Sequence, residues 1–161
     1  MIDALDCRIL QLFTTRPRLG VLEASRQLGV ARGTVQARLD RLTERGVITS
    51  WAPHVDPAAL GYAVTAFATL QIRQGTGHDV VAAHLATIPE VLEVHTVTGS
   101  ADLLCRLVAR SNADLQRVID AVVAHPAIER SSSVIALATQ IPLRVLPLLE
   151  RPPAGGPGQN R

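Results

Sequence analysis

The fold of this chain is decided by the stretch VLEASRQLGVARGTVQARLDRLTERGVI, residues 21–48. It predicts two short helices joined by a tight turn at Gly29, where a residue without a Cβ atom suits the sharp change of direction. Ser25 is small enough to let the helices cross closely, and Val30 can fill the space between them. The second helix carries an apolar stripe at helical spacing, formed by Val35, Leu39 and Leu42. This pattern is typical of a helix-turn-helix, whose second helix fits a DNA major groove.

The exposed side of the second helix carries residues that suit contact with DNA. Arginines can bind phosphates or guanine edges, and small residues let the helix approach the bases closely. The alternative is a solvated amphipathic helix whose charges pair three or four residues apart. The turn, the small residues and the row of arginines on one flank of the helix together favour DNA binding. These arginines are Arg38, Arg41 and Arg45. The residues expected to contact DNA are Arg32, Gly33, Thr34, Gln36, Ala37, Arg38, Arg41 and Arg45.

Charge is distributed unevenly along the 161 residues, although the formal net charge is only +2. Residues 1–50 contain eight arginines and five acidic residues, whereas residues 51–161 contain eight arginines and nine acidic residues. The basic excess therefore accompanies the helix-turn-helix, as contact with nucleic acid requires.

The remaining composition indicates an aliphatic core and a reducing compartment. Apolar residues make up 47% of the chain and aromatic residues only 2%. The two cysteines, Cys7 and Cys105, lie in apolar patterns and are interpreted as buried thiols. The first residues lack the pattern of a secretory signal, and no apolar run approaches the roughly 20 residues of a membrane span. We therefore expect a cytoplasmic protein.

A further helix is predicted over residues 3–14 and completes a three-helix module. Pro17 ends this helix because proline disfavours the helical region at the residue before it. After the module, Val47 and Ile48 are expected to begin an extended segment, and two prolines and a glycine within residues 51–61 predict a linker. The apolar face of the first helix consists of Leu5, Ile9, Leu12 and Phe13.

The second half of the chain alternates between strand and helix patterns. Tyr62–Ile72 alternates small or apolar residues with polar ones, as a strand with one buried face does. The order strand, helix, strand, strand, helix, strand predicts a ferredoxin-like βαββαβ sheet with both helices on one face. The other elements are expected at His78–Ile88, Val91–Thr98, Asp102–Arg110, Asn112–His125 and Ser131–Ile141.

The second face of this sheet is too apolar to face water comfortably. A second copy of the sheet is its natural cover, which predicts a homodimer. The residues expected on this face are Thr65, Phe67, Val97, one of Leu103 and Leu104, and one of Val134 and Ile135. The expected division is a helix-turn-helix domain at 1–50, a linker at 51–61, a sheet domain at 62–150 and a disordered tail at 151–161.

A helix-turn-helix followed by βαββαβ in one short chain resembles the Lrp/AsnC family of bacterial and archaeal regulators, also called feast/famine regulators. The resemblance covers roughly residues 2–147. It implies an α+β fold, with a three-helix winged helix-turn-helix domain and a ferredoxin-like (RAM-type) sheet domain. It also implies homodimers, often assembled into octamers, that bind operator DNA and sense a small molecule, usually an amino acid. Its motifs are Leu5-Asp6-Cys7-Arg8-Ile9-Leu10, Glu23 ahead of Leu28-Gly29-Val30, Thr34-Val35, Arg38-Leu39-x-Arg41-Leu42, Gly46-Val47-Ile48, Val55-Asp56-Pro57 and Leu60-Gly61.

The resemblance implies an effector site between sheet domains, beside the loop that joins the second and third strands. That loop is Thr98-Gly99-Ser100-Ala101-Asp102, which matches the family's G-x-x-D pattern. A glycine lets backbone amides approach a carboxylate, and Asp102 can accept hydrogen bonds from an ammonium group. The alternative is a β-hairpin turn in which Gly99 supplies a positive φ and Asp102 caps locally.

Two positions depart from the family pattern. Ala31 stands where a serine usually caps the recognition helix, and the missing cap is expected to cost ~1 kcal/mol. Ser50-Trp51 replaces the common Gly-Tyr after the module.

Neither a metal site nor a cofactor site is predicted. The five histidines show no ligand spacing with one another, and neither cysteine lies at zinc spacing to another ligand. His95 near Ser100 and Asp102 lacks the signature of a catalytic triad and is interpreted as a sheet-face residue.

Three classes of function are compatible with these features. A transcription regulator that responds to an amino acid ranks first, and an architectural DNA-compacting oligomer without a ligand ranks second. A tetrapyrrole decarboxylase ranks third, because some haem-biosynthesis decarboxylases use a similar two-domain frame. Such an enzyme is expected to lack a functional DNA-contacting surface, whereas residues 34–45 keep one here.

Overall fold

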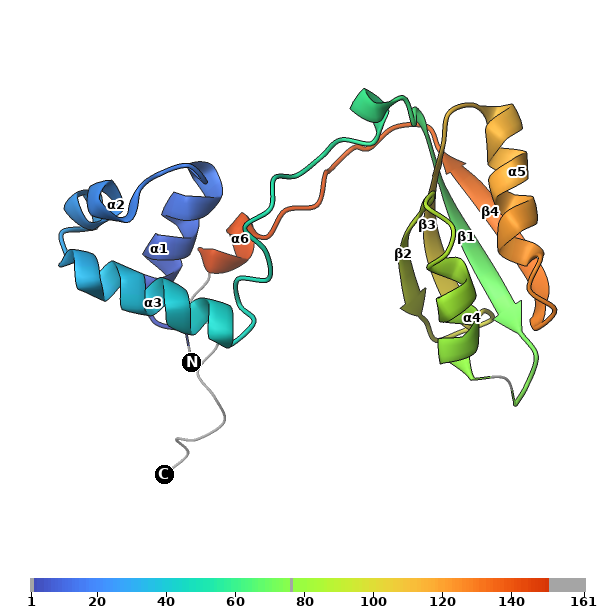
Figure 1. The fold of residues 1–161 in the computed structure, drawn as a ribbon, viewed down its shortest axis with the longest axis horizontal. Helices are drawn as coiled ribbons and strands as arrows, with labels where there is room; N and C mark the ends of the chain where they lie inside the picture. Colours follow the sequence, from blue (N-terminus) through green and yellow to red (C-terminus); the bar gives the residue numbers. More distant parts are fainter. Residues whose placement is uncertain (1, 76, 151–161) are drawn as a thin grey trace. The chain divides into compact units, whose positions relative to one another are not determined.

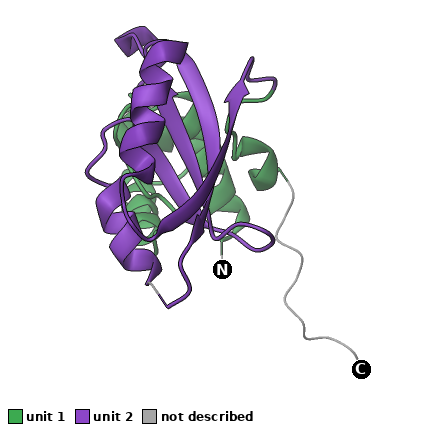
Figure 2. Ribbon diagram, turned by 90° about the vertical axis from the view of Figure 1, so that its right-hand side faces the viewer, with its two compact units in different colours: residues 1–53, 141–161 green, residues 54–140 purple. Residues whose placement is uncertain are grey.

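The computed structural model describes residues 2–75 and 77–150, which form two compact units (Figure 1, Figure 2). The helical unit contains the described residues of 1–53 and 141–161, and the sheet unit contains residues 54–140. This division differs from the expected one, in which the sheet domain runs to residue 150. Residues 141–150 group with the helices because helix α6 (Leu146–Leu149) contacts helix α1 (Ala4–Thr15). The predicted tail lies outside the described residues.

The helical unit has the three helices that the sequence predicts, namely α1, α2 (Val21–Leu28) and α3 (Arg32–Glu44). Helix α1 begins at a reciprocal capping box between Asp3 and Asp6, which satisfies two backbone N–H groups at its start. The predicted apolar stripe of α3 is confirmed as part of the core of the unit. The core consists of Ile9, Phe13, Ala24, Leu28, Val35, Leu39 and Leu42.

No helix within the described ranges is long and apolar enough to cross a membrane.

The turn between α2 and α3 depends on Gly29, as predicted. Its φ of 69° lies in the left-handed region that favours glycine. The N–H of Val30 donates to the carbonyl of Ser25 at 3.1 Å, and the buried Ser25 hydroxyl donates to the carbonyl of Leu22 at 2.7 Å. Helix α3 then begins after Ala31, whose side chain makes no capping hydrogen bond. The turn therefore fixes where α3 starts without help from a side-chain cap.

The segment after α3 folds back on the helices rather than extending as a wing. The N–H groups of Val47 and Ile48 both donate to the carbonyl of Leu42, at 2.9 and 3.1 Å. Trp51 packs edge-on against Phe13, with ring centroids 5.8 Å apart. The described part of the helical unit contains no strand, so the β-wing in the expected fold description is absent from it.

The sheet unit confirms the predicted βαββαβ order (Figure 1). Its four strands are antiparallel and lie in the order β2-β3-β1-β4. A short 3-10 helix, η1 (Ala58–Leu60), lies within the predicted linker. The elements are β1 (Val64–Ile72), α4 (His78–Leu85), β2 (Val91–Thr96), β3 (Leu103–Ala109), α5 (Asn112–Val123) and β4 (Ile128–Ala136).

The two faces of the sheet differ in what covers them. Helices α4 and α5 cover one face, where apolar residues of β1 and β3 pack against Val81, Leu85 and Val118. On the other face, Phe67 is 38% exposed and lies opposite Val134, which is 63% exposed. We call this second side of the sheet the outer face. The sequence leaves open whether Leu103 or Leu104 lies on this face. In the structure Leu103 is buried, and Leu104 pairs with Thr69 on the outer face.

The last strand is placed differently from the prediction over Ser131–Ile141. It runs over Ile128–Ala136, because its length is set by pairing with β1 from Thr65 to Ile72. Leu137 has no partner on β1 and is 97% exposed. The polar residues Glu129 and Arg130 therefore belong to the strand, although their polarity indicates a loop.

Candidate nucleic-acid interface and effector loop

Helix α3 exposes several small side chains on its first turns and charged side chains on its last turns. Five of the predicted contact residues, Arg32, Gly33, Thr34, Gln36 and Ala37, are exposed on its first turns. A Cβ atom added to Gly33 would meet no atom within 4 Å, so no described side chain packs against the helix at this point. The small side chains and the open approach make these turns the part of α3 that can come closest to base edges.

One side-chain contact and one backbone contact help to shape the rest of that surface. The amide of Gln36 donates to Asp40 at 2.8 Å, one turn along the helix. Arg45 forms the C-cap of α3, where its N–H donates to the carbonyl of Arg41 at 3.0 Å. The exposed contact between Gln36 and Asp40 is easily exchanged for a contact with another partner.

The structure gives Arg38 and Arg41 partners inside the helical unit. Asp6, on α1, is completely buried, and Arg38 donates to its Oδ1 at 2.9 Å. Arg41 donates through one nitrogen to both oxygens of Asp6, at 3.2 and 3.0 Å. Arg38 also binds Asp3. Two of the eight predicted contact residues therefore tie α3 to α1, in addition to any role on DNA.

Electrostatics supports this connection between the helices. The hydrogen bond from Arg38, and then that from the backbone of Asp6, hold the pKa of Asp3 below its usual value. The same contacts with Asp3 and Asp6 raise the pKa of Arg38. Sequence reasoning missed this arrangement, although one signal was present: Asp6 lies among the apolar residues of α1, where a carboxylate cannot be buried without partners.

The predicted effector loop, residues 98–102, is attached to the end of β1. The carboxylate of Asp102 accepts from the N–H of Ile72 at 2.8 Å, and the N–H of Asp102 donates to the carbonyl of Leu70 at 2.9 Å. Gly99 has a φ of 114°, as the turn interpretation predicts. The side-chain amide of Gln71 donates to the carbonyl of Ser100 at 2.5 Å. Asp102 therefore has a structural partner, and Gln71 is a neighbour of the loop that the sequence did not indicate.

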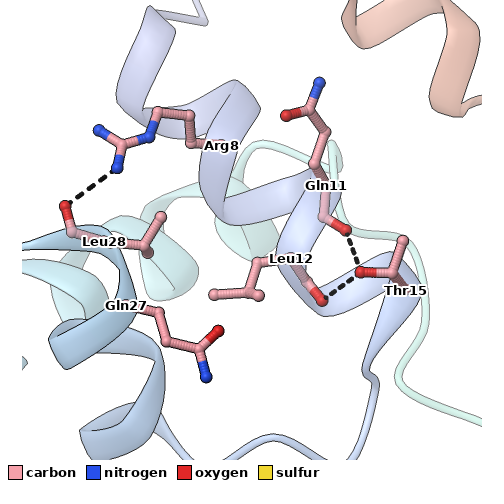
Figure 3. Close-up of a pocket in the computed structure, with 6 residues that line it drawn as sticks. All are labelled: Arg8, Gln11, Leu12, Thr15, Gln27 and Leu28. Carbon is pink, nitrogen blue, oxygen red and sulfur yellow. Dashed lines mark hydrogen bonds between the residues drawn. The ribbon is translucent and has the colours of Figure 1, made fainter.

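A separate open depression of about 360 Å³ lies between α1 and α2 (Figure 3). It shares no residue with α3 or with the effector loop. The guanidinium of Arg8 is held over it by a hydrogen bond of 3.1 Å to the carbonyl of Leu28. The other lining residues are Gln11, Leu12, Thr15 and Gln27.

The fold brings two histidines together that their spacing does not predict. The rings of His84 and His125 lie 5.2 Å apart, and Nε2 of His84 is 3.0 Å from the carbonyl oxygen of Ala121. Across residues 2–75 and 77–150, no three metal-ligating side chains form a group. Cys105 is buried, and this burial raises the pKa of its thiol to about 11, whereas Cys7 is half-buried.

Both halves of the chain match models of known protein families. Residues 2–43 match the AsnC-type helix-turn-helix domain, and residues 65–146 match the Lrp/AsnC ligand binding domain. The chain is 29% identical over 147 residues to the HTH-type transcriptional regulator FL11 of Pyrococcus horikoshii, covering 91% of this chain and 97% of that protein. It is 28% identical over 148 residues to the regulatory protein AsnC of Escherichia coli, covering 91% and 97%.

Solved structures share the arrangement of elements. The structure of E. coli AsnC superimposes with a TM-score of 0.84 at 28% identity, covering 91% of this chain and 99% of that chain. A feast or famine regulatory protein from M. tuberculosis, complexed with L-methionine, has a TM-score of 0.81 at 23% identity and covers 90% and 98%. The relatives that match in sequence are regulators and not enzymes. The chain belongs to the Lrp/AsnC family and is a helix-turn-helix transcriptional regulator.

Proposed function

We propose that this regulator reads specific DNA sequences with the first turns of α3, as part of a homodimer. The observation that carries this proposal is the exposed surface around Gly33 and Ala37, in the half of the chain that holds the basic excess. Phosphate contacts position such a helix and base-edge contacts give it specificity. A regulator acts where the chromosome is, so we place it in the cytoplasm. The proposed reading residues are Arg32, Gly33, Thr34, Gln36 and Ala37, and Arg45 at the end of α3 is proposed as a phosphate contact outside the reading surface.

The homodimer is proposed to form through the outer face of the sheet. Phe67 and Val134 are partners across β1 and β4 and are exposed on this face, and Leu104 lies on the same face opposite Thr69. These apolar side chains can be buried when two such sheets pack face to face. A two-fold dimer carries two copies of α3, which suits half-sites about one helical turn of DNA, or a multiple, apart. Larger assemblies such as octamers, which the family resemblance implies, would combine several such dimers.

Selection of bound sequences from a random duplex pool tests this function. We expect enrichment of a motif with two-fold symmetry, because both copies of α3 read the same bases. The measurement is sequencing of the bound fraction after several rounds at physiological salt. Binding without any enriched motif would instead indicate an architectural DNA-compacting protein, and would contradict the proposal.

We further propose that an amino acid binds beside the loop of residues 98–102. The backbone around Gly99 is open, since a Cβ atom added there would meet nothing within 4 Å. The L-methionine complex of the M. tuberculosis structure supports this class of ligand. The carboxylate of the ligand would bind the backbone amides of the loop, and its ammonium group would approach Asp102.

The change Asp102→Asn separates the charge of this residue from its structural hydrogen bond. Asparagine keeps an oxygen that can accept from the N–H of Ile72, but it removes the negative charge. We expect the native protein to gain thermal stability from at least one of the twenty amino acids, and the variant to lose about 10-fold or more in affinity for that ligand. DNA binding without ligand should stay unchanged.

The measurement is the shift in thermal unfolding as a function of ligand concentration. Asp102→Ala is the comparison, because it removes both the charge and the hydrogen bond and should also loosen the loop. Equal ligand affinity of the native protein and Asp102→Asn would place the effector elsewhere.

A further inference from the structure

The four side chains that join α1 to α3 form a charge-balanced cluster. Asp3 and Asp6 come from the start of α1, and Arg38 and Arg41 come from the flank of α3. We call these four residues the interhelix cluster. Its positive and negative charges cancel, so it adds nothing to the net attraction between the helical unit and a phosphate backbone.

Burial distinguishes the members of the interhelix cluster. The side chain of Asp6 has 0% exposure, whereas those of Arg38 and Arg41 are 25% and 44% exposed. A buried carboxylate that loses its cations keeps the full cost of desolvation, because water cannot reach it. A phosphate that recruited both arginines would leave Asp6 in that state. The cluster therefore favours keeping both guanidinium groups on Asp6.

We propose that Asp6 is a positioning residue for DNA recognition, because it holds Arg38 and Arg41 against α1 and so keeps them off the DNA phosphates. This inference rests on the proposed function, in which α3 is the reading helix. It narrows the reading surface to the first turns of α3, and it reassigns two arginines that the sequence alone places among the DNA contacts. Asp6 sets the placement of α3 without touching DNA.

The salt dependence of DNA binding tests this assignment. Each arginine that contacts a phosphate releases counterions, and its loss reduces the slope of log affinity against log salt by about 0.9. The test variant is the double change Asp3→Asn with Arg41→Gln, which conserves net charge, keeps an asparagine that can cap α1, and leaves Asp6 paired with Arg38. The comparison variant is Arg32→Gln, because Arg32 is exposed on the proposed reading surface.

Affinity is measured by fluorescence anisotropy on a random-sequence duplex of about 30 base pairs, between about 50 and 200 mM salt. We expect the double variant to keep the native slope and Arg32→Gln to lose about one unit of slope. A loss of about one unit in the folded double variant would show that Arg41 contacts a phosphate, and would overturn the inference. A native protein that binds no duplex would overturn the proposed function, and this inference with it.

Asp6→Asn supplies a second readout that a purely structural role would not produce. This variant removes the negative charge that holds Arg41, whereas Arg38 can still bind Asp3. The slope on the same duplex should therefore become steeper by about one contact. A folded Asp6→Asn variant with the native slope would contradict the inference. If Asp6→Asn does not fold, the double variant decides the question by itself, since it keeps the Asp6–Arg38 pair.

Discussion

Replacing Ala37 with glutamate is expected to weaken binding to duplex DNA at least about 100-fold, or roughly 2.7 kcal/mol. Ala37 lies one turn after Gly33 on the exposed side of α3, where the proposed complex brings the helix closest to DNA. A glutamate there adds bulk and places a carboxylate against phosphates and base acceptors, and like charges at an interface cost several kcal/mol. The folded state should tolerate the change, because exposed substitutions usually alter stability by less than about 0.5 kcal/mol.

Ala83→Glu is the matched control for this prediction. Ala83 is likewise an exposed alanine within a helix, but it lies on α4 in the sheet unit. Both variants lower the net charge by one, so a general electrostatic effect would appear equally in both. Anisotropy titrations at low salt should show a large loss for Ala37→Glu and little change for Ala83→Glu. Equal affinities would exclude α3 as the DNA-reading helix.

Replacing Val134 with glutamate is expected to convert the proposed dimer into monomers, with a dimerisation affinity at least about 100-fold weaker. Val134 is 63% exposed in the single chain, so the glutamate can remain hydrated in a monomer. In a dimer that pairs two outer faces, the same carboxylate would be buried without a partner, which costs several kcal/mol. Phe67 is a poorer choice, because Arg106 lies opposite it in the strand register and can neutralise a new carboxylate.

Val80→Glu is the control for the dimer prediction. Val80 is 55% exposed on α4, and α4 packs against the other face of the sheet. Analytical ultracentrifugation of both variants at micromolar concentration gives the comparison. We expect monomers for Val134→Glu and native-sized particles for Val80→Glu. A dimeric Val134→Glu protein would show that the outer face is not the interface.

Local patterns were sufficient to predict the helices and most of the strands. Val35, Leu39 and Leu42 follow the helical period and are buried, and Gly29 has the left-handed φ that the turn requires. Such features depend on residues close together in the sequence. The resemblance to the Lrp/AsnC family then indicated that the two halves together form one regulator. No local pattern contains this information.

Features that depend on distant partners were harder to predict. The bounds of β4 follow from its register on β1, and residues 141–150 group with α1 because of α6. Helical spacing alone places Arg38 and Arg41 on an exposed flank, because the buried Asp6 that binds them is more than 30 residues away. The partner of Asp102 on β1 is likewise fixed by strand pairing.

Sedimentation of the native protein at low salt, with and without a duplex of the selected sequence, tests whether paired sheets bring two copies of α3 to DNA. We expect a dimer in free solution and a complex that contains at least two chains on each duplex, because the sheets pair and both copies of α3 bind. A protein that sediments as a single chain, and whose sedimentation is unchanged by the duplex, would contradict this expectation.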